Sequence, residues 1–131
     1  MQILKLIVPI YYKQVFKTKK NKMILVGMNN YRNWHYILSN KIKSHYCSLI
    51  KSQYDGSKFE NPLVHYKIYA KRRGVDGGNI RSVIEKFVLD GLVEVGAIPN
   101  DTIDYIDEDR SNYSIDKDNP RAEIYLTEKK K

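Results

Sequence analysis

The sequence predicts an α+β fold in which a small mixed or antiparallel sheet of about four strands packs against two main helices. Residues 80–95 place apolar side chains at i, i+3, i+4 and i+7, which indicates a half-buried helix, and an earlier stretch repeats the pattern. Alternating apolar runs at 2–9, 63–69 and 121–127 are typical of strands. A chain of 131 residues supports one hydrophobic core, so we expect a single domain over residues 1–131.

The first quarter of the chain predicts two strands joined by a basic loop. Residues 2–9 form the first strand, which Pro9 ends. Residues 10–22 are rich in tyrosine and then in lysine, which favours either a nucleic-acid contact or a loop or hairpin with solvated lysines. Residues 23–28 predict a short strand.

A long helix should follow. Asn29-Asn30 is a suitable N-cap, and the helical pattern continues to about Gln53. Its apolar stripe consists of Tyr31, Trp34, Leu38, Ile42, Tyr46, Leu49 and Ile50.

The second half of the chain predicts a strand, a helix and a hairpin. The strand at 63–69 ends in a glycine-containing turn, and the helix after it continues to Val95. The segment from Ile103 to Ile115 and the strand 121–127 should pair as an antiparallel hairpin, and residues 128–131 should fray.

Charge is divided unevenly along the chain. Residues 1–75 carry 15 Lys/Arg against 2 Asp/Glu, a net +13, whereas residues 76–131 carry 8 against 13, a net −5. This division suits a metal-dependent enzyme that acts on a polyanion, but solvated lysines in a protein from an AT-rich genome explain it equally well. The single cysteine, Cys47, excludes an internal disulfide and a cysteine-based zinc site. No apolar run is long enough for a signal peptide or membrane span, so we expect the protein in the cytoplasm.

Polar residues gather around the helix at 80–95. The basic triplet Lys71-Arg72-Arg73 and the turn Asp76-Gly77-Gly78-Asn79 precede it, and Asp101 follows it. At about 100° per residue, Lys86 and Asp90 each fall within roughly 20° of Asn79, beside the apolar stripe. Packing alone does not require this combination of amide, cation and carboxylate, so the pattern indicates a site.

This stretch resembles the core of the RusA-like Holliday junction resolvases of bacteriophages and prophages. That family has a basic run, Asp-x-Asp-Asn opening a helix, a Lys four residues before Asp-Ala-Leu, a glycine-containing turn and a closing Asp-Asp. The counterparts here are Lys71-Arg72-Arg73, Asp76-Gly77-Gly78-Asn79, Lys86 with Asp90-Gly91-Leu92, Gly96, and Asn100-Asp101. Asn29-Asn30-Tyr31-Arg32-Asn33 also resembles phage members.

The resemblance implies an endodeoxyribonuclease that resolves Holliday junctions and other branched DNA in phage recombination, processing or repair. Asp76 and Asp101 would hold Mg²⁺, or alternatively Mn²⁺, with Asp90 replacing the second motif acid. Lys86 would stabilise the transition state or orient a carboxylate, and Asn79 would hydrogen-bond a carboxylate or cap the helix. Phosphate contacts would come from Lys71, Arg72 and Arg73 and from Lys19 and Lys20 in the basic loop.

Gly78 and Asn100 stand where the family has acids. This leaves a second interpretation open, in which the chain is a catalytically impaired relative that binds DNA or a host protein.

The length of the helix limits how its acids combine. From Asn79 to Asp90 is roughly 16 Å of helix, so Asp76 and Asp90 cannot share one ion. Asp101 reaches Asp76 only if the chain after the helix returns, or if a two-fold homodimer sets one helix start beside its mate's helix end. We therefore predict a homodimer, which also suits paired cuts in a junction.

Overall fold

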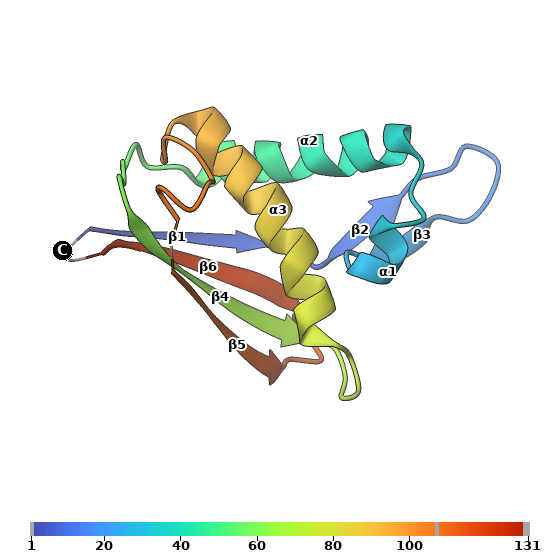
Figure 1. The fold of residues 1–131 in the computed structure, drawn as a ribbon. Coiled ribbons are helices and arrows are strands. Elements are labelled where there is room, and N and C mark those ends of the chain that lie inside the picture. The colour runs from blue at the N-terminus through green and yellow to red at the C-terminus, as the bar shows by residue number, and fades with distance from the viewer. Residues whose placement is uncertain (1, 107, 130–131) are drawn as a thin grey trace.

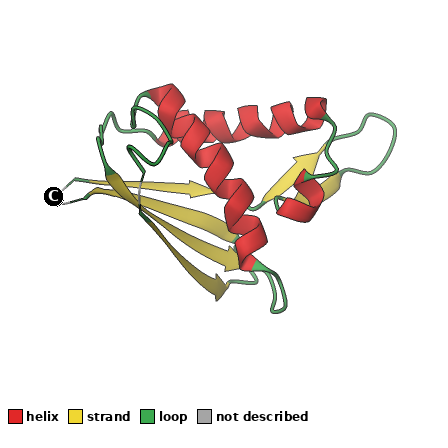
Figure 2. Ribbon diagram, in the orientation of Figure 1, coloured by secondary structure: helices red, strands yellow, loops and turns green. Residues whose placement is uncertain are grey.

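The computed structural model describes residues 2–106 and 108–129, and it confirms the α+β class. A four-stranded sheet has the strand order β1-β6-β4-β5, and the main helices α2 and α3 both lie on one of its faces (Figures 1 and 2). The strands are β1 (Ile3–Val8), β4 (Pro62–Ala70), β5 (Asp109–Ile115) and β6 (Arg121–Glu128).

The last strand lies inside the sheet, so the predicted hairpin of the C-terminal strands is wrong. β6 pairs antiparallel with both β1 and β4, whereas β5 pairs parallel with β4 at the edge of the sheet. Hydrophobicity explains this order. Ala122, Ile124 and Leu126 are fully buried, and β6 therefore needs neighbours on both sides, while almost every residue of β5 is exposed.

The basic loop predicted at 10–22 is largely a β-hairpin, one of the two forms that the sequence allowed. It consists of β2 (Tyr11–Gln14) and β3 (Lys22–Leu25), which pair antiparallel and form a separate two-stranded sheet. The lysine-rich residues between the strands form its tip, which projects beyond the main sheet (Figure 1).

The first long helix is broken, and Asn29-Asn30 does not cap it. A single turn, α1 (Met28–Tyr31), precedes α2 (Tyr36–Gln53), whose N-cap is His35 with its ring accepting from the Ile37 amide. The asparagine amide groups bond backbone carbonyls instead: Asn30 donates to Leu25 and Asn33 to Asn29. Such local bonds compete with helix continuation.

Helix α3 (Gly77–Val95) crosses the sheet and supplies the centre of the core, as its periodicity predicted. Its buried residues are Ile80, Val83, Ile84, Phe87, Val88, Leu89, Gly91 and Leu92. They meet Ile42, Tyr46 and Ile50 of α2 and the inward side chains of the sheet. Gly96 ends the helix with φ 86°, a left-handed conformation that glycine adopts without strain. Among the residues that the structure describes, no helix is long and apolar enough to cross a bilayer.

The prediction that the tail frays from residue 128 is wrong in part. Glu128 is the last residue of β6, and the Lys129 amide donates to the Asn61 carbonyl at 3.0 Å. Residues 130 and 131 lie outside the described residues.

Candidate functional site

The turn between β4 and α3 places Asp76 at the start of the helix. Gly74 has φ 81° and reverses the chain after the basic triplet. Asp76 is then the N-cap of α3, and its Oδ1 accepts from the Asn79 amide at 3.3 Å. The cap leaves the second carboxylate oxygen of Asp76 without a hydrogen bond among the described residues.

A pocket of about 220 Å³ brings several of the predicted site residues together. Asp76, Asn79 and Arg72 line it from the α3 side. Asn29 and Asn30 of α1 line the opposite wall, although the sequence assigned them to a helix cap. The pocket therefore presents one carboxylate, several amide groups and a guanidinium at the positive end of the α3 dipole, a set that suits a phosphate-bearing ligand.

The basic residues lie around this pocket. Lys71, Arg72 and Arg73 are all exposed, and none forms an ion pair with a described residue. Arg72 also lines a neighbouring hollow of about 490 Å³ together with Lys22, the first residue of β3. Lys19 and Lys20 are exposed near the hairpin tip, where the Lys19 ammonium lies 4.3 Å from the centre of the Phe16 ring.

Lys86 and Asp90 continue along α3, away from the pocket. The Lys86 ammonium is exposed and lies 5.8 Å from the centre of the Tyr31 ring. Asp90 pairs with Lys43 of α2 at 3.6 Å and is roughly 21 Å from Asp76 along the helix axis. Asp90 therefore ties the two helices together and does not join Asp76 in one site within this chain.

Asp101 lies at the other end of α3, so the two predicted metal ligands do not meet within one protomer. From Asp76 to Gly96 the helix rises roughly 30 Å. The chain after it is anchored there, because the Ala97 carbonyl accepts from the Phe59 amide and Ile98 is buried. Three further residues reach roughly 10 Å at most, which corrects the expectation that the chain itself returns to Asp76.

The same conclusion holds for metal ligands in general. Within residues 2–106 and 108–129, no three His, Cys, Asp or Glu side chains gather closely enough to hold a metal ion. Within the described residues, Asp76, Asp90 and Asp101 are therefore not gathered into one cluster.

A second cluster, which was not predicted from the sequence, joins α3 to the edge strand β5. Arg81 pairs with Glu85 at 3.3 Å and with Asp109 of β5. Burial raises the pKa of the Glu85 carboxyl; the Arg81 charge opposes this shift and the Asp109 charge adds to it. The spacing of Arg81 and Glu85 was visible in the sequence, but Asp109 came from a segment whose pairing was predicted wrongly. Because Arg81 of α3 pairs with Asp109 of β5, the cluster stabilises the contact between these two elements.

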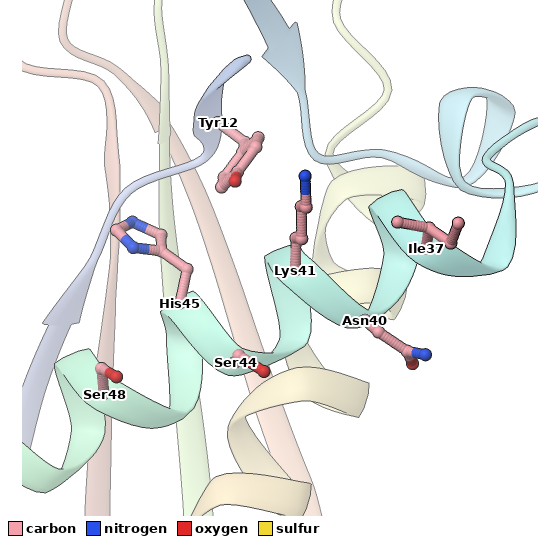
Figure 3. Close-up of a pocket in the computed structure, with 7 residues that line it drawn as sticks. All are labelled: Tyr12, Ile37, Asn40, Lys41, Ser44, His45 and Ser48. Atoms are coloured by element: carbon pink, nitrogen blue, oxygen red, sulfur yellow. The ribbon is translucent and has the colours of Figure 1, made fainter. Parts of the chain in front are cut away.

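A further hollow of about 540 Å³ lies between α2 and β2 (Figure 3). Tyr12 and His45 meet there edge to face with their ring centres 5.6 Å apart, and the exposed Lys41 projects beside them. No carboxylate lines this hollow. It is well separated in the sequence from the predicted acids and does not share a lining residue with the Asp76 pocket.

Comparison with known proteins adds no family assignment, since neither a protein-family model nor a curated protein matches this sequence.

Proposed function

We propose that this chain is a Mg²⁺-dependent endonuclease that cuts four-way DNA junctions as a two-fold homodimer, with Mn²⁺ as an alternative ion. The observation that carries the proposal is the pocket in which Asp76, Asn79 and Arg72 meet beside an unneutralised basic triplet. The resemblance to RusA-like resolvases rests on these same residues together with Lys86, Asp90 and Asp101.

The edge of the sheet suggests how two protomers would associate. Strand β5 pairs with β4 on one side, and the strand order leaves its other side open. The end of β5 lies next to the start of α3, since a Cβ on Gly77 would touch the Tyr113 ring. An open strand edge is a template for pairing with another chain.

Antiparallel pairing of β5 with the same strand of a second copy would complete the site. The start of the partner strand would then lie beside Ile115, the last residue of β5. Figure 1 shows that this end of β5 lies next to the start of α3. The segment that carries Asp101 leads into that strand start, so it would approach Asp76 from the partner. One carboxylate from each protomer, with water, is a set of ligands that Mg²⁺ accepts. In such a site the ion would activate water and neutralise charge on the phosphate.

The remaining residues would position the DNA. Lys71, Arg72 and Arg73 would hold phosphates on one side of the pocket, and Lys19 and Lys20 would reach the backbone farther out. Lys86, exposed on α3 beyond Asn79, would lie along the path of a strand that leaves the pocket.

Cleavage of a synthetic four-way junction tests the proposal. Wild-type protein with Mg²⁺ should give symmetric nicks, and Asp76→Asn should abolish them while the protein remains folded. Nicks that survive the loss of both Asp76 and Asp101 would show that the assigned residues do not act.

A non-catalytic DNA-binding protein is the second candidate. Gly78 and Asn100 occupy motif positions of acids, and Asp90 is engaged by Lys43, which together favour this alternative. It predicts tight junction binding that is unchanged by Asp76→Asn and no nicks with either metal.

A further inference from the structure

The face of the main sheet opposite the helices is open. Both α2 and α3 cover the other face (Figure 2). Strand alternation and register place Leu4, Val64 and Ile124 toward the helices, so their neighbours point away from the core. The open face carries the odd-numbered residues of β1, β4 and β6 and the even-numbered residues of β5.

One cross-strand row of this face combines cations and rings. Lys5, Tyr125, His65 and Arg110 lie opposite one another on β1, β6, β4 and β5. The Lys5 and Lys67 ammonium groups lie 5.5 Å and 5.0 Å from the centre of the Tyr125 ring. The His65 ring centre is 6.4 Å from that of Tyr125. An aromatic side chain at the middle of the sheet is thus surrounded by positive charge.

The charge of the face is not balanced by acids. Asp116, in the turn after β5, pairs with Arg121 of this face. Within the described strands, Glu123 is the single carboxylate at an open-face position, and it is 7% exposed. It accepts from Arg121 at 2.8 Å and from the Tyr125 hydroxyl at 2.7 Å. Lys5, Lys67 and Arg110 form no ion pair with any described residue. Two copies of such a face would repel each other, whereas a polyanion would be attracted.

Among polyanions, the aromatic rings of the open face favour a single-stranded nucleic acid. A base stacks on an aromatic ring only when it is free of its duplex partner, and a four-stranded sheet with exposed rings accommodates two or three unpaired bases. Lys67 is held beside Tyr125 by a weak cation–π contact and can turn toward a phosphate. Lys5 also hydrogen-bonds the Tyr125 hydroxyl, and its ammonium lies at the same ring.

We propose that the open sheet face binds single-stranded nucleic acid, with Tyr125 stacking on a base and Lys5, Lys67 and Arg110 contacting phosphates. This site is separate from the Asp76 pocket and does not depend on nuclease activity.

Fluorescence anisotropy with a labelled 12-nucleotide oligothymidylate, in EDTA so that no cleavage occurs, tests the proposal. Tyr125→Leu should weaken binding about 10-fold, because stacking on one base is lost. Tyr125→Phe keeps the ring and should bind like wild type. Lys5→Gln and Lys67→Gln should each weaken binding and lower the slope of log affinity against log salt by about one.

Matched controls come from exposed residues elsewhere. Tyr36→Leu removes an exposed ring and Lys58→Gln an exposed cation, both away from the open face, and neither should have these effects. Equal binding by Tyr125→Leu and wild type, with both proteins folded, would overturn the proposal. The proposal would also be overturned if inorganic polyphosphate, at equal total charge, displaced the labelled probe as well as unlabelled oligonucleotide does. The probe is single-stranded and the assay contains no metal. A failure to bind it would therefore not bear on whether the protein cuts four-way junctions.

Discussion

At the scale of single residues, the contact between Gly91 and Ile50 limits how closely α2 and α3 pack. A Cβ added at Gly91 would lie 2.5 Å from Ile50 Cδ1.

A double-mutant cycle tests this pairing. Gly91→Ala should gain about 1 kcal/mol of helix propensity but lose about 1–3 kcal/mol to overpacking, and thus lower the free energy of unfolding. In an Ile50→Val background, which lacks Cδ1, the same change should raise it by up to about 1 kcal/mol. Urea unfolding measures both, and equal effects in the two backgrounds would show that the contact does not control packing.

Arg121 links two carboxylates on the open face of the sheet. Its guanidinium donates to Asp116 and to Glu123, both at 2.8 Å. The hydrogen bond from Arg121 lowers the pKa of Asp116. Burial would raise the pKa of Glu123, but the hydrogen bonds from Tyr125 and Arg121 more than offset this and lower it.

A depressed carboxyl pKa stabilises the fold above the usual carboxyl range, and this contribution is lost as the pH falls through the folded-state pKa. Arg121→Met should therefore lower the free energy of unfolding at pH 7, and the difference from wild type should narrow as the pH falls from about 5 to 2. Arg110→Met, which removes an exposed and unpaired cation, is the control. A difference that stays constant with pH would refute the linkage.

At the scale of elements, two substitutions of Asp76 at the N-terminus of α3 distinguish its contribution to stability from its proposed role in cleavage. Asp76→Ala removes the cap and should cost about 1 kcal/mol, whereas Asp76→Asn retains a side-chain acceptor and should cost little. Thermal unfolding of the two variants measures this difference. If asparagine were as destabilising as alanine, the loss of nicking in Asp76→Asn would no longer report on the carboxylate.

The elements also show which parts of the fold the sequence could predict. Helix α3 was predicted nearly to the residue, since both its apolar period and its terminal Asp76 and Gly96 are local signals. The break before α2 was missed because the side chains of Asn30 in α1 and Asn33 just after it bond backbone carbonyls, which a periodic pattern does not record. The order of the C-terminal strands was missed because β5 and β6 do not pair with each other. Each pairs with β4, which lies between them in the sheet but is distant from both in the sequence.

The candidate site, like the fold, was predictable where its residues are close in the sequence and not where they are distant. Arg72, Asp76 and Asn79 are close in the chain, and the structure brings them into one pocket. Asn29 and Asn30 join them through tertiary packing, and Asp101 lies at the far end of α3 because the helix is rigid and the chain after it is anchored near Phe59.

At the scale of the whole molecule, the proposed function requires two copies. Light scattering at micromolar concentration should give twice the 15.4 kDa mass of the chain. The open edge of β5 provides the physical reason. A monomeric mass at that concentration, with or without junction DNA, would contradict a site assembled from two protomers.

Mixing two inactive variants tests the shared site most directly. Asp76→Asn and Asp101→Asn homodimers should each fail to nick a four-way junction in Mg²⁺. If the site takes Asp76 from one protomer and Asp101 from its partner, a mixed dimer has one site with both substitutions and one with none. Mixing after unfolding and refolding together should then restore nicking to about a quarter of the wild-type sites, given random pairing. A refolded mixture as inactive as its two components, beside an active wild-type control, would contradict the account.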